Sequence, residues 1–235
     1  MKFIAVKSYD DMSEIAANLI AAQVICKPTS VLGFATGSTP VGTYEKLIDR
    51  YEKGLLDFSS ITTFNLDEYC GLTDTDPNSY HCFMMDNLFS HINTPVSSIH
   101  LPSGIADDMN EECERYDKAI EAAGGIDLQL LGIGNNGHIG FNEPDDIFHN
   151  NTWVVELAES TIEANKRFFE DSSMVPRSAV TMGIKTIMSA KQVIMLAGPE
   201  KAPIVNELRK NICTPAVPAS ILHYHQNCLF IYVES

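Results

Sequence analysis

Apolar runs of strand length alternate with helical patterns from one end of this chain to the other. Several runs are apolar at nearly every position, which is typical of parallel strands covered on both faces. Because the connections are short, the alternation predicts an α/β fold: a doubly wound, mostly parallel, Rossmann-like sheet flanked by helices. No linker or internal repeat divides the chain, so we expect a single domain over residues 1–235. The strands are expected near Lys2–Val6, Ser30–Ala35, Ile61–Leu66, Ile126–Ile133, Val154–Leu157, Val193–Ala197 and Cys228–Val233.

Helical patterns fill the segments between these runs. In the first of them, Ile15, Leu19, Ala22 and Ile25 fall on one face. A second one opens with a proline in its first turn, where proline is tolerated. The expected helices are Asp11–Ile25, Pro40–Tyr51, Asp107–Ala122, Ser160–Phe169 and Pro199–Leu208.

The charge of the chain limits its partners. With 16 Lys and Arg against 31 Asp and Glu, the formal net charge is −15, which argues against nucleic acid or an anionic membrane surface. If the ligand is an anion, only a few basic residues can hold it. The apolar runs are too short for a membrane span or a signal peptide. The six scattered cysteines form no C-x-x-C pair and indicate reduced thiols in a cytoplasmic protein.

Four polar motifs each follow a predicted strand. In doubly wound sheets, ligands bind beyond the carboxyl ends of the strands, where the winding reverses. If the strands are parallel, all four motifs lie at one edge of the sheet, and we expect a single site to hold them. The motifs are Thr36-Gly37-Ser38-Thr39-Pro40, Asp67-Glu68-Tyr69, Asn135-Asn136-Gly137-His138 and Gly198-Pro199-Glu200-Lys201.

The third motif belongs to a glycine-rich loop that carries a histidine and a glutamate. Histidine exchanges protons near neutral pH, and Glu143 is close enough in sequence to orient His138 or to relay protons to it. The glycine spacing also matches a dinucleotide-binding fingerprint, but no helical pattern opens at its third glycine, Gly137. The sequence therefore predicts an acid–base site here and not a nicotinamide site.

The first and second motifs suggest an anion site and a base. The first joins a strand to a helix through small hydroxyl residues, an arrangement that favours phosphate; the alternative is an ordinary helix cap made by Ser38 or Thr39. In the second motif, strand alternation sends the two adjacent carboxylates in different directions. Only one should face the site, and we expect it to be Asp67, acting as a general base. The alternative is a solvated loop acid or a cap.

Two basic residues are candidate anion anchors. Arg167 precedes two aromatic residues in this acidic chain, and Lys201 lies one turn into a predicted helix, where a cation opposes the helix dipole. Both could equally be surface cations. His223 and His225 would lie on one face of a strand as a possible metal pair, but no third ligand is evident nearby, and we predict no metal site.

Together these motifs resemble the glucosamine-6-phosphate deaminase family, also called glucosamine-6-phosphate isomerase. The resemblance runs in ordered blocks over nearly the whole chain. It implies the conversion of D-glucosamine 6-phosphate and water to D-fructose 6-phosphate and ammonia, without a metal or organic cofactor. The blocks are Leu32–Pro40, Asn65–Leu72, Asn78–Tyr80, Gly137–Pro144, Ala164–Phe169 and Pro218–Ser220.

The resemblance also implies roles for particular residues. His138, supported by Glu143 and Asn136, would move protons during opening of the sugar ring. Asp67 would abstract the proton at C2 and return it at C1, and the nitrogen would then leave as ammonia. The substrate phosphate would be held by Gly37, Ser38, Thr39, Arg167 and Lys201.

The chain departs from the family pattern in two places. Many members have an aspartate where this chain has Asn136; an amide can orient His138 but cannot stabilise an imidazolium as a carboxylate does, so Glu143 would supply the charge. Larger members are activated by N-acetylglucosamine 6-phosphate through basic residues beyond the Glu-Pro pair. Here Asn150–Glu156 contains no cation, and the chain ends soon after its last predicted strand. We therefore expect a short, non-allosteric form, either monomeric or homo-oligomeric.

Three alternative functions compete with this one. The same reaction on galactosamine 6-phosphate differs only in pocket contacts that sequence does not fix. A 6-phosphogluconolactonase would typically have Leu-Phe-Pro after the histidine and Asp-Glu-Arg in place of Asp67-Glu68-Tyr69. A non-catalytic sugar-phosphate sensor that regulates transcription would need a basic DNA-binding segment, which this acidic chain lacks.

Overall fold

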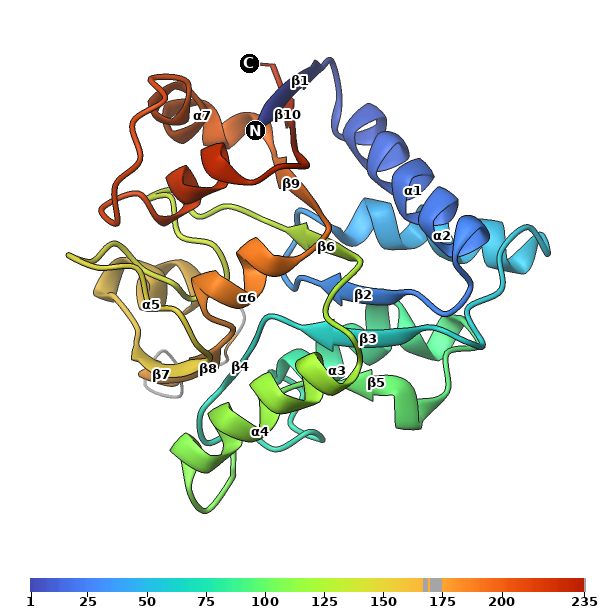
Figure 1. Ribbon diagram of the computed structural model, residues 1–235, viewed down its shortest axis with the longest axis horizontal. Coiled ribbons are helices and arrows are strands. Elements are labelled where there is room, and N and C mark those ends of the chain that lie inside the picture. The colour runs from blue at the N-terminus through green and yellow to red at the C-terminus, as the bar shows by residue number, and fades with distance from the viewer. Residues whose placement is uncertain (167–168, 170–174, 235) are drawn as a thin grey trace.

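The core of the structure is a seven-stranded sheet in the order β1-β10-β9-β6-β2-β3-β5, in which all neighbouring strands run parallel. The computed structural model describes residues 1–166, 169 and 175–234. The first and last strands of the chain, β1 and β10, pair in parallel at one edge of this sheet (Figure 1). The strands are β1 (Lys2–Val6), β2 (Val31–Phe34), β3 (Thr62–Asn65), β5 (Ile99–His100), β6 (Leu128–Leu131), β9 (Gln192–Ala197) and β10 (Cys228–Val233).

Helices cover both faces of this sheet (Figure 1). The first three, α1 to α3, enclose a core that includes Ile20, Leu47 and Met84. On the opposite face, α4, α6 and α7 enclose a second core that includes Tyr116 and Val205. This arrangement confirms the predicted doubly wound α/β fold. The helices are α1 (Tyr9–Cys26), α2 (Val41–Glu52), α3 (Tyr80–Asn87), α4 (Met109–Ala122), α5 (Glu159–Asn165), α6 (Ile184–Ser189) and α7 (Ala202–Leu208).

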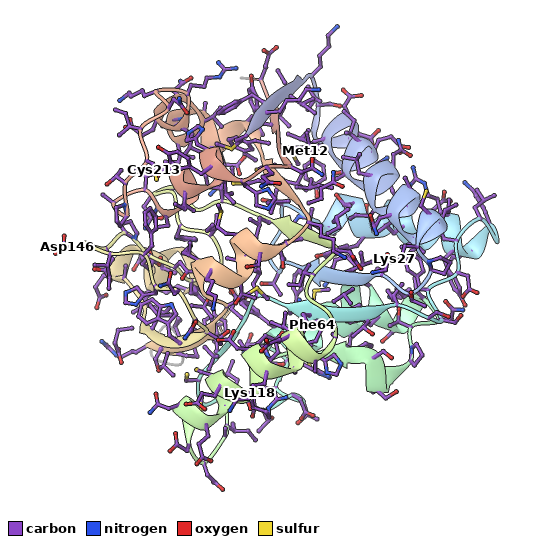
Figure 2. The ribbon with its side chains drawn as sticks, in the orientation of Figure 1. Met12, Lys27, Phe64, Lys118, Asp146 and Cys213 are labelled. Carbon is purple, nitrogen blue, oxygen red and sulfur yellow. The ribbon has the colours of Figure 1, made fainter. Side chains whose placement is uncertain are left out.

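Helix α1 shows how local sequence sets these elements. Its N-cap is Ser8, whose hydroxyl accepts a hydrogen bond from the backbone N–H of Asp11 at 3.0 Å. The helix ends just before Lys27 (Figure 2), which precedes a proline and is therefore biased away from helical angles. Among the described residues, no helix is both long enough and apolar enough to cross a lipid bilayer.

A second, smaller sheet was only partly predicted. It is antiparallel, in the order β4-β8-β7, and has its own apolar core that includes Tyr69, Phe141 and Val155. The sequence predicted β7, but β4 is only three residues long and begins with two carboxylates, and β8 is four residues long. Neither shows a clear alternating pattern. The strands are β4 (Asp67–Tyr69), β7 (Trp153–Glu156) and β8 (Ser178–Thr181).

Several other predictions of local structure were incomplete or wrong. Helices α3 and α6 and strand β5 were not predicted because they have eight, six and two residues, too few to establish a period. The predicted helix at Pro199–Leu208 is a 3₁₀ turn, η5 (Pro199–Lys201), followed by α7. The predicted helix at Ser160–Phe169 corresponds to α5, and part of its C-terminal end lies outside the described residues. Among the described residues, the other 3₁₀ turns are η1 (Phe89–His91), η2 (Val96–Ser98) and η6 (Pro218–Tyr224).

The strand predicted around His223 and His225 was wrong, because this segment lies at the end of η6. The two rings face different partners. Nε2 of His223 lies 2.9 Å from the carbonyl of Leu208, and Nε2 of His225 lies 2.8 Å from the carbonyl of Ala190. Within the described ranges, no group of three or more His, Cys, Asp or Glu side chains is arranged to hold a metal.

Candidate active site

The carboxyl ends of four adjacent parallel strands open into one cleft of about 930 Å³. The strand order reverses between β2 and β6, which is where doubly wound sheets bind ligands. Residues of all four predicted motifs line this cleft, so the prediction that one cavity holds them is confirmed. These residues are Thr36, Gly37, Ser38, Thr39, Asp67, Asn135, Asn136, His138, Gly198, Pro199, Glu200 and Lys201.

The loop after β2, Thr36–Pro40, leads directly into α2. Gly37 has φ +95°, a left-handed angle that side chains disfavour, and it turns the chain at the cleft. The alternative interpretation, an ordinary cap, finds no support, because the Pro40 N-cap position makes no side-chain hydrogen bond. Backbone N–H groups at a helix start are suited to an anion.

Lys201 contributes a cation to the same cleft. Its ammonium donates to Oδ1 of Asn135 at 2.7 Å, which links the loop after β9 to the loop after β6. Lys201 is the last residue of the η5 turn and precedes α7, so it lies one 3₁₀ turn into the helical segment that begins at Pro199. The other predicted anchor, Arg167, lies outside the described residues.

The two adjacent carboxylates separate as strand alternation predicted. Asp67 lines the cleft and is only 5 % exposed. Glu68 points away and accepts hydrogen bonds from the backbone N–H groups of Tyr80 and His81, at 2.9 and 3.0 Å, at the start of α3. Glu68 is therefore a structural cap, and Asp67 is the carboxylate that can meet a ligand.

The environment of Asp67 favours its neutral form. Burial raises the pKa of Asp67 well above its ordinary value, and the neighbouring Glu68 carboxylate raises it further. Within the part of the chain that the structure describes, no group donates a hydrogen bond to the Asp67 carboxylate. Once ionised, such a carboxylate is a strong base, because little around it stabilises its charge.

The loop after β6 folds back on itself and brings His138 into the cleft. The backbone N–H of Gly134 donates to the carbonyl of His138 at 3.0 Å. A Cβ at position 134 would lie 2.3 Å from Cε1 of the His138 ring, so only glycine lets the ring lie here. No helix follows this loop before α5, which agrees with the exclusion of a dinucleotide site.

Glu143 is held by several polar groups around His138. Its Oε2 lies 3.4 Å from Nδ1 of His138, a charge contact without the alignment of a hydrogen bond. The same oxygen accepts from the amide of Asn136 at 2.7 Å. Its Oε1 accepts a short hydrogen bond from the hydroxyl of Thr161, in α5. Burial raises the pKa of Glu143, but its contacts with His138, Thr161 and Asn136 outweigh that effect and hold the pKa below its ordinary value.

Asn136 was expected from the sequence to orient the His138 ring, but its hydrogen bonds go to the Glu143 carboxylate and to the His138 backbone. Its amide donates to Glu143, and its Oδ1 accepts from the backbone N–H of His138 at 3.2 Å. It therefore fixes the loop and the carboxylate and does not contact the imidazole directly. An aspartate at this position would place a second carboxylate oxygen where the amide now donates.

Sequence reasoning missed three residues that line the cleft: Tyr9, Tyr80 and Thr161. Tyr80 stacks on Phe141 with ring centroids 5.8 Å apart and forms an apolar wall. The block that contains Tyr80 was noted in the sequence, but nothing there gave it a role. Tyr9 and Thr161 belong to helices α1 and α5, which lie outside the four motifs in the sequence, and no local sequence pattern predicts that they reach the cleft.

Comparisons with known proteins agree with this geometry. Residues 7–231 match the family described as glucosamine-6-phosphate isomerases/6-phosphogluconolactonase. The chain is 58 % identical over 232 residues to a glucosamine-6-phosphate deaminase of Lachnoclostridium phytofermentans, covering 98 % of both chains. It is 51 % identical to a glucosamine-6-phosphate deaminase of Clostridioides difficile, covering all of this chain and 95 % of that one.

Solved structures show the same relationship. One that is described as a monomeric glucosamine-6-phosphate deaminase superposes with a TM-score of 0.97 at 45 % identity, covering 99 % of this chain and 97 % of the other. A 6-phosphogluconolactonase from Thermotoga maritima superposes with a TM-score of 0.79 at 20 % identity, covering 100 % and 99 %. The second likeness concerns the fold alone.

Proposed function

The chain belongs to the glucosamine-6-phosphate isomerase/6-phosphogluconolactonase family, and from this premise we propose that it converts D-glucosamine 6-phosphate and water to D-fructose 6-phosphate and ammonia. The observation that carries the proposal is the cleft itself. A buried carboxylate, Asp67, and His138 both line it, and Glu143 lies 3.4 Å from the His138 ring. The two relatives reported above, from Lachnoclostridium phytofermentans and Clostridioides difficile, are both named glucosamine-6-phosphate deaminase.

The proposed reaction needs two proton transfers at different atoms. In the first, His138 takes the proton of the C1 hydroxyl and delivers it to the ring oxygen as the ring C1–O bond breaks. The imidazolium that forms in passing is stabilised by Glu143, which lies 3.4 Å away. Because the pKa of Glu143 is held low, it carries its negative charge at neutral pH.

In the second transfer, Asp67 abstracts the proton at C2. The electron pair moves onto the C1 oxygen, and a proton of the substrate ammonium passes to that oxygen, which gives an enolamine. The same carboxyl returns a proton to C1, which leaves a protonated imine at C2. Water adds to that carbon and ammonia departs, giving the ketose. A nearly buried carboxylate to which no described residue donates a hydrogen bond suits this step, since removing a proton from carbon requires a strong base close to the carbon.

The substrate phosphate would bind remote from the reacting carbons. Gly37, Ser38 and Thr39 offer a helix start and hydroxyl groups, and Lys201 offers a cation. Arg167 remains a proposed anchor. Fixing the phosphate would hold C1 and C2 near the acid–base groups. The free state of all six cysteines supports the further proposal that the enzyme works in the cytoplasm.

One assay tests the function directly: release of ammonia from glucosamine 6-phosphate, galactosamine 6-phosphate and unphosphorylated glucosamine, with and without a chelator. We expect rapid release from the first compound, slower release from the second and little from the third, with no effect of the chelator. A protein that releases no ammonia but hydrolyses 6-phosphogluconolactone would instead have the second activity of the family, that of a 6-phosphogluconolactonase.

A further inference from the structure

Tyr9 lines the cleft, yet neither the motifs nor the proposed reaction gives it a role. It is the first residue of α1 and is 41 % exposed. The Ser8 cap fixes where α1 begins, and so fixes the position of Tyr9. Tyr9 therefore reaches the cleft from a helix, α1, that carries none of the four motifs.

The Tyr9 hydroxyl holds the Thr36–Pro40 loop and the start of α2 through two backbone groups. It donates to the carbonyl of Ser38 at 3.1 Å and accepts from the N–H of Gly42 at 2.8 Å. Gly42 lies in the first turn of α2, where N–H groups have no partner within the helix. Tyr9 thus caps α2 from a different helix, at the point where the Pro40 position provides no side-chain cap.

The bond to Ser38 also determines which backbone groups a bound anion would meet. A carbonyl oxygen turned toward a phosphate would repel it, whereas an N–H group would attract it. A trans peptide unit is planar, so the carbonyl of Ser38 and the N–H of Thr39 point in opposite directions. By holding the carbonyl, Tyr9 fixes the direction of that N–H as well.

Gly42 provides the space for this contact. A Cβ at position 42 would lie 2.7 Å from Cε1 of Tyr9 and 2.6 Å from Oγ of Ser13, and both distances are shorter than a van der Waals contact. A larger residue would displace the Tyr9 ring. Tyr9 and Gly42 therefore form a matched pair at the contact between α1 and α2.

We propose that Tyr9 is a positioning residue for the substrate phosphate: its hydroxyl holds the Thr36–Pro40 loop in the conformation that binds the phosphate group. The inference rests on the proposed function, which makes this loop the phosphate site. Tyr9 has no part in proton transfer, so its loss weakens binding of substrate and transition state equally. Such a loss raises KM and leaves kcat unchanged.

The test compares Tyr9→Phe, which removes only the hydroxyl, with wild type. We expect KM for glucosamine 6-phosphate and Kd for fructose 6-phosphate to rise about 3- to 10-fold, as for one lost hydrogen bond, with kcat within about twofold. Gly42→Ala should change both constants in the same direction. The double variant should add little to either single one, because both break the same contact. Tyr224→Phe, at a tyrosine that is 73 % exposed and does not line the cleft, is the matched control.

Binding of fructose 6-phosphate is measured by calorimetry, so it does not depend on turnover. Unchanged binding by Tyr9→Phe, or a loss confined to kcat, would overturn the inference. If wild type binds fructose 6-phosphate but releases no ammonia from glucosamine 6-phosphate, the proposed function fails, while the binding data still decide the role of Tyr9. If wild type binds no sugar phosphate, both proposals fail.

Discussion

The residues proposed to bind the phosphate and the carboxylate proposed to act as the base, Asp67, have opposite surroundings in the cleft. In the Thr36–Pro40 loop Ser38 is exposed, and Lys201 is half-buried; both reach the cleft and offer hydroxyl, backbone and ammonium donors. Asp67 is nearly buried, and among the described residues no group donates a hydrogen bond to its carboxylate. Exposed donors can hold an anion that arrives from water, whereas isolation makes a carboxylate a better base. Substitutions in the first group should therefore change binding, and substitutions in the second should change rate.

The largest effect is expected at Asp67. Asp67→Asn keeps the size of the side chain but removes the base, so kcat should fall by about 10² to 10⁴ while fructose 6-phosphate still binds. Steady-state kinetics and calorimetry on the same preparation provide both numbers. A variant that loses binding along with rate would show that Asp67 also anchors the substrate, and the contrast between the two groups would break.

The same variant should be more stable than wild type at neutral pH. Burial raises the pKa of Asp67 above its value in the unfolded chain, so ionising this carboxyl destabilises the folded protein. The penalty is absent below about pH 4, the ordinary carboxyl range, and grows as the pH rises toward the elevated pKa of the folded state. Thermal unfolding across this range should give Asp67→Asn a higher Tm than wild type at neutral pH, and the difference in Tm should shrink in acid. A difference in Tm that does not change with pH would mean that burial of the ionised Asp67 carboxylate does not destabilise the fold.

A smaller effect on binding is expected at Lys201. Lys201→Ala should weaken binding of glucosamine 6-phosphate and fructose 6-phosphate by about 1.5 to 3 kcal/mol, the range of a lost charge-assisted hydrogen bond, with a minor change in kcat. Lys185→Ala, at an exposed lysine that does not line the cleft, serves as the matched control. Equal binding by Lys201→Ala and wild type would make Lys201 a surface cation only.

Thr161 tests whether the acid–base network reaches beyond the motifs. Thr161→Val removes the donor to Oε1 of Glu143, so the pKa of Glu143 should rise. The acid limb of the pH profile of kcat/KM should then move to higher pH, with a loss of about 3- to 10-fold near that limb. Thr161→Ser, which keeps the hydroxyl, should restore the profile. An unshifted limb in the valine variant would mean that Thr161 does not act through Glu143.

No effect at all is expected from N-acetylglucosamine 6-phosphate. An activator must meet one conformation better than another, and the Asn150–Glu156 segment offers no cation for a phosphate. Initial rates should follow a hyperbola with or without this compound. A sigmoidal curve that the compound makes hyperbolic would reveal a regulatory site elsewhere.

The scaffold and much of the site could be predicted from sequence for a physical reason. Buried parallel strands such as β2, β6 and β9 are apolar nearly throughout, so they stand out as runs. Parallel strands place their carboxyl ends at one edge, which brought the four motifs together. Alternation within a strand was enough to separate Asp67 from Glu68.

The remaining features depend on packing that a local pattern does not record. The small β4-β8-β7 sheet is made of short strands, and β4 pairs with β8 across more than a hundred residues of sequence. Tyr9 and Thr161 enter the cleft from α1 and α5, through the way these helices pack against the loops. The contact of Asn136 with Glu143, and not with the imidazole, follows from the fold of the glycine-rich loop.

The separation of roles between Asp67 and the His138–Glu143 pair is tested most directly by solvent deuterium exchange. Fructose 6-phosphate is incubated with ammonium in D₂O, and deuterium entering C1 is followed by NMR for wild type, Asp67→Asn and His138→Gln. Because the sugar ring also opens spontaneously in water, His138→Gln should retain exchange while losing most ammonia release from glucosamine 6-phosphate. Asp67→Asn should lose the exchange itself. Exchange at the wild-type rate in Asp67→Asn would contradict the assignment of Asp67 as the carbon base.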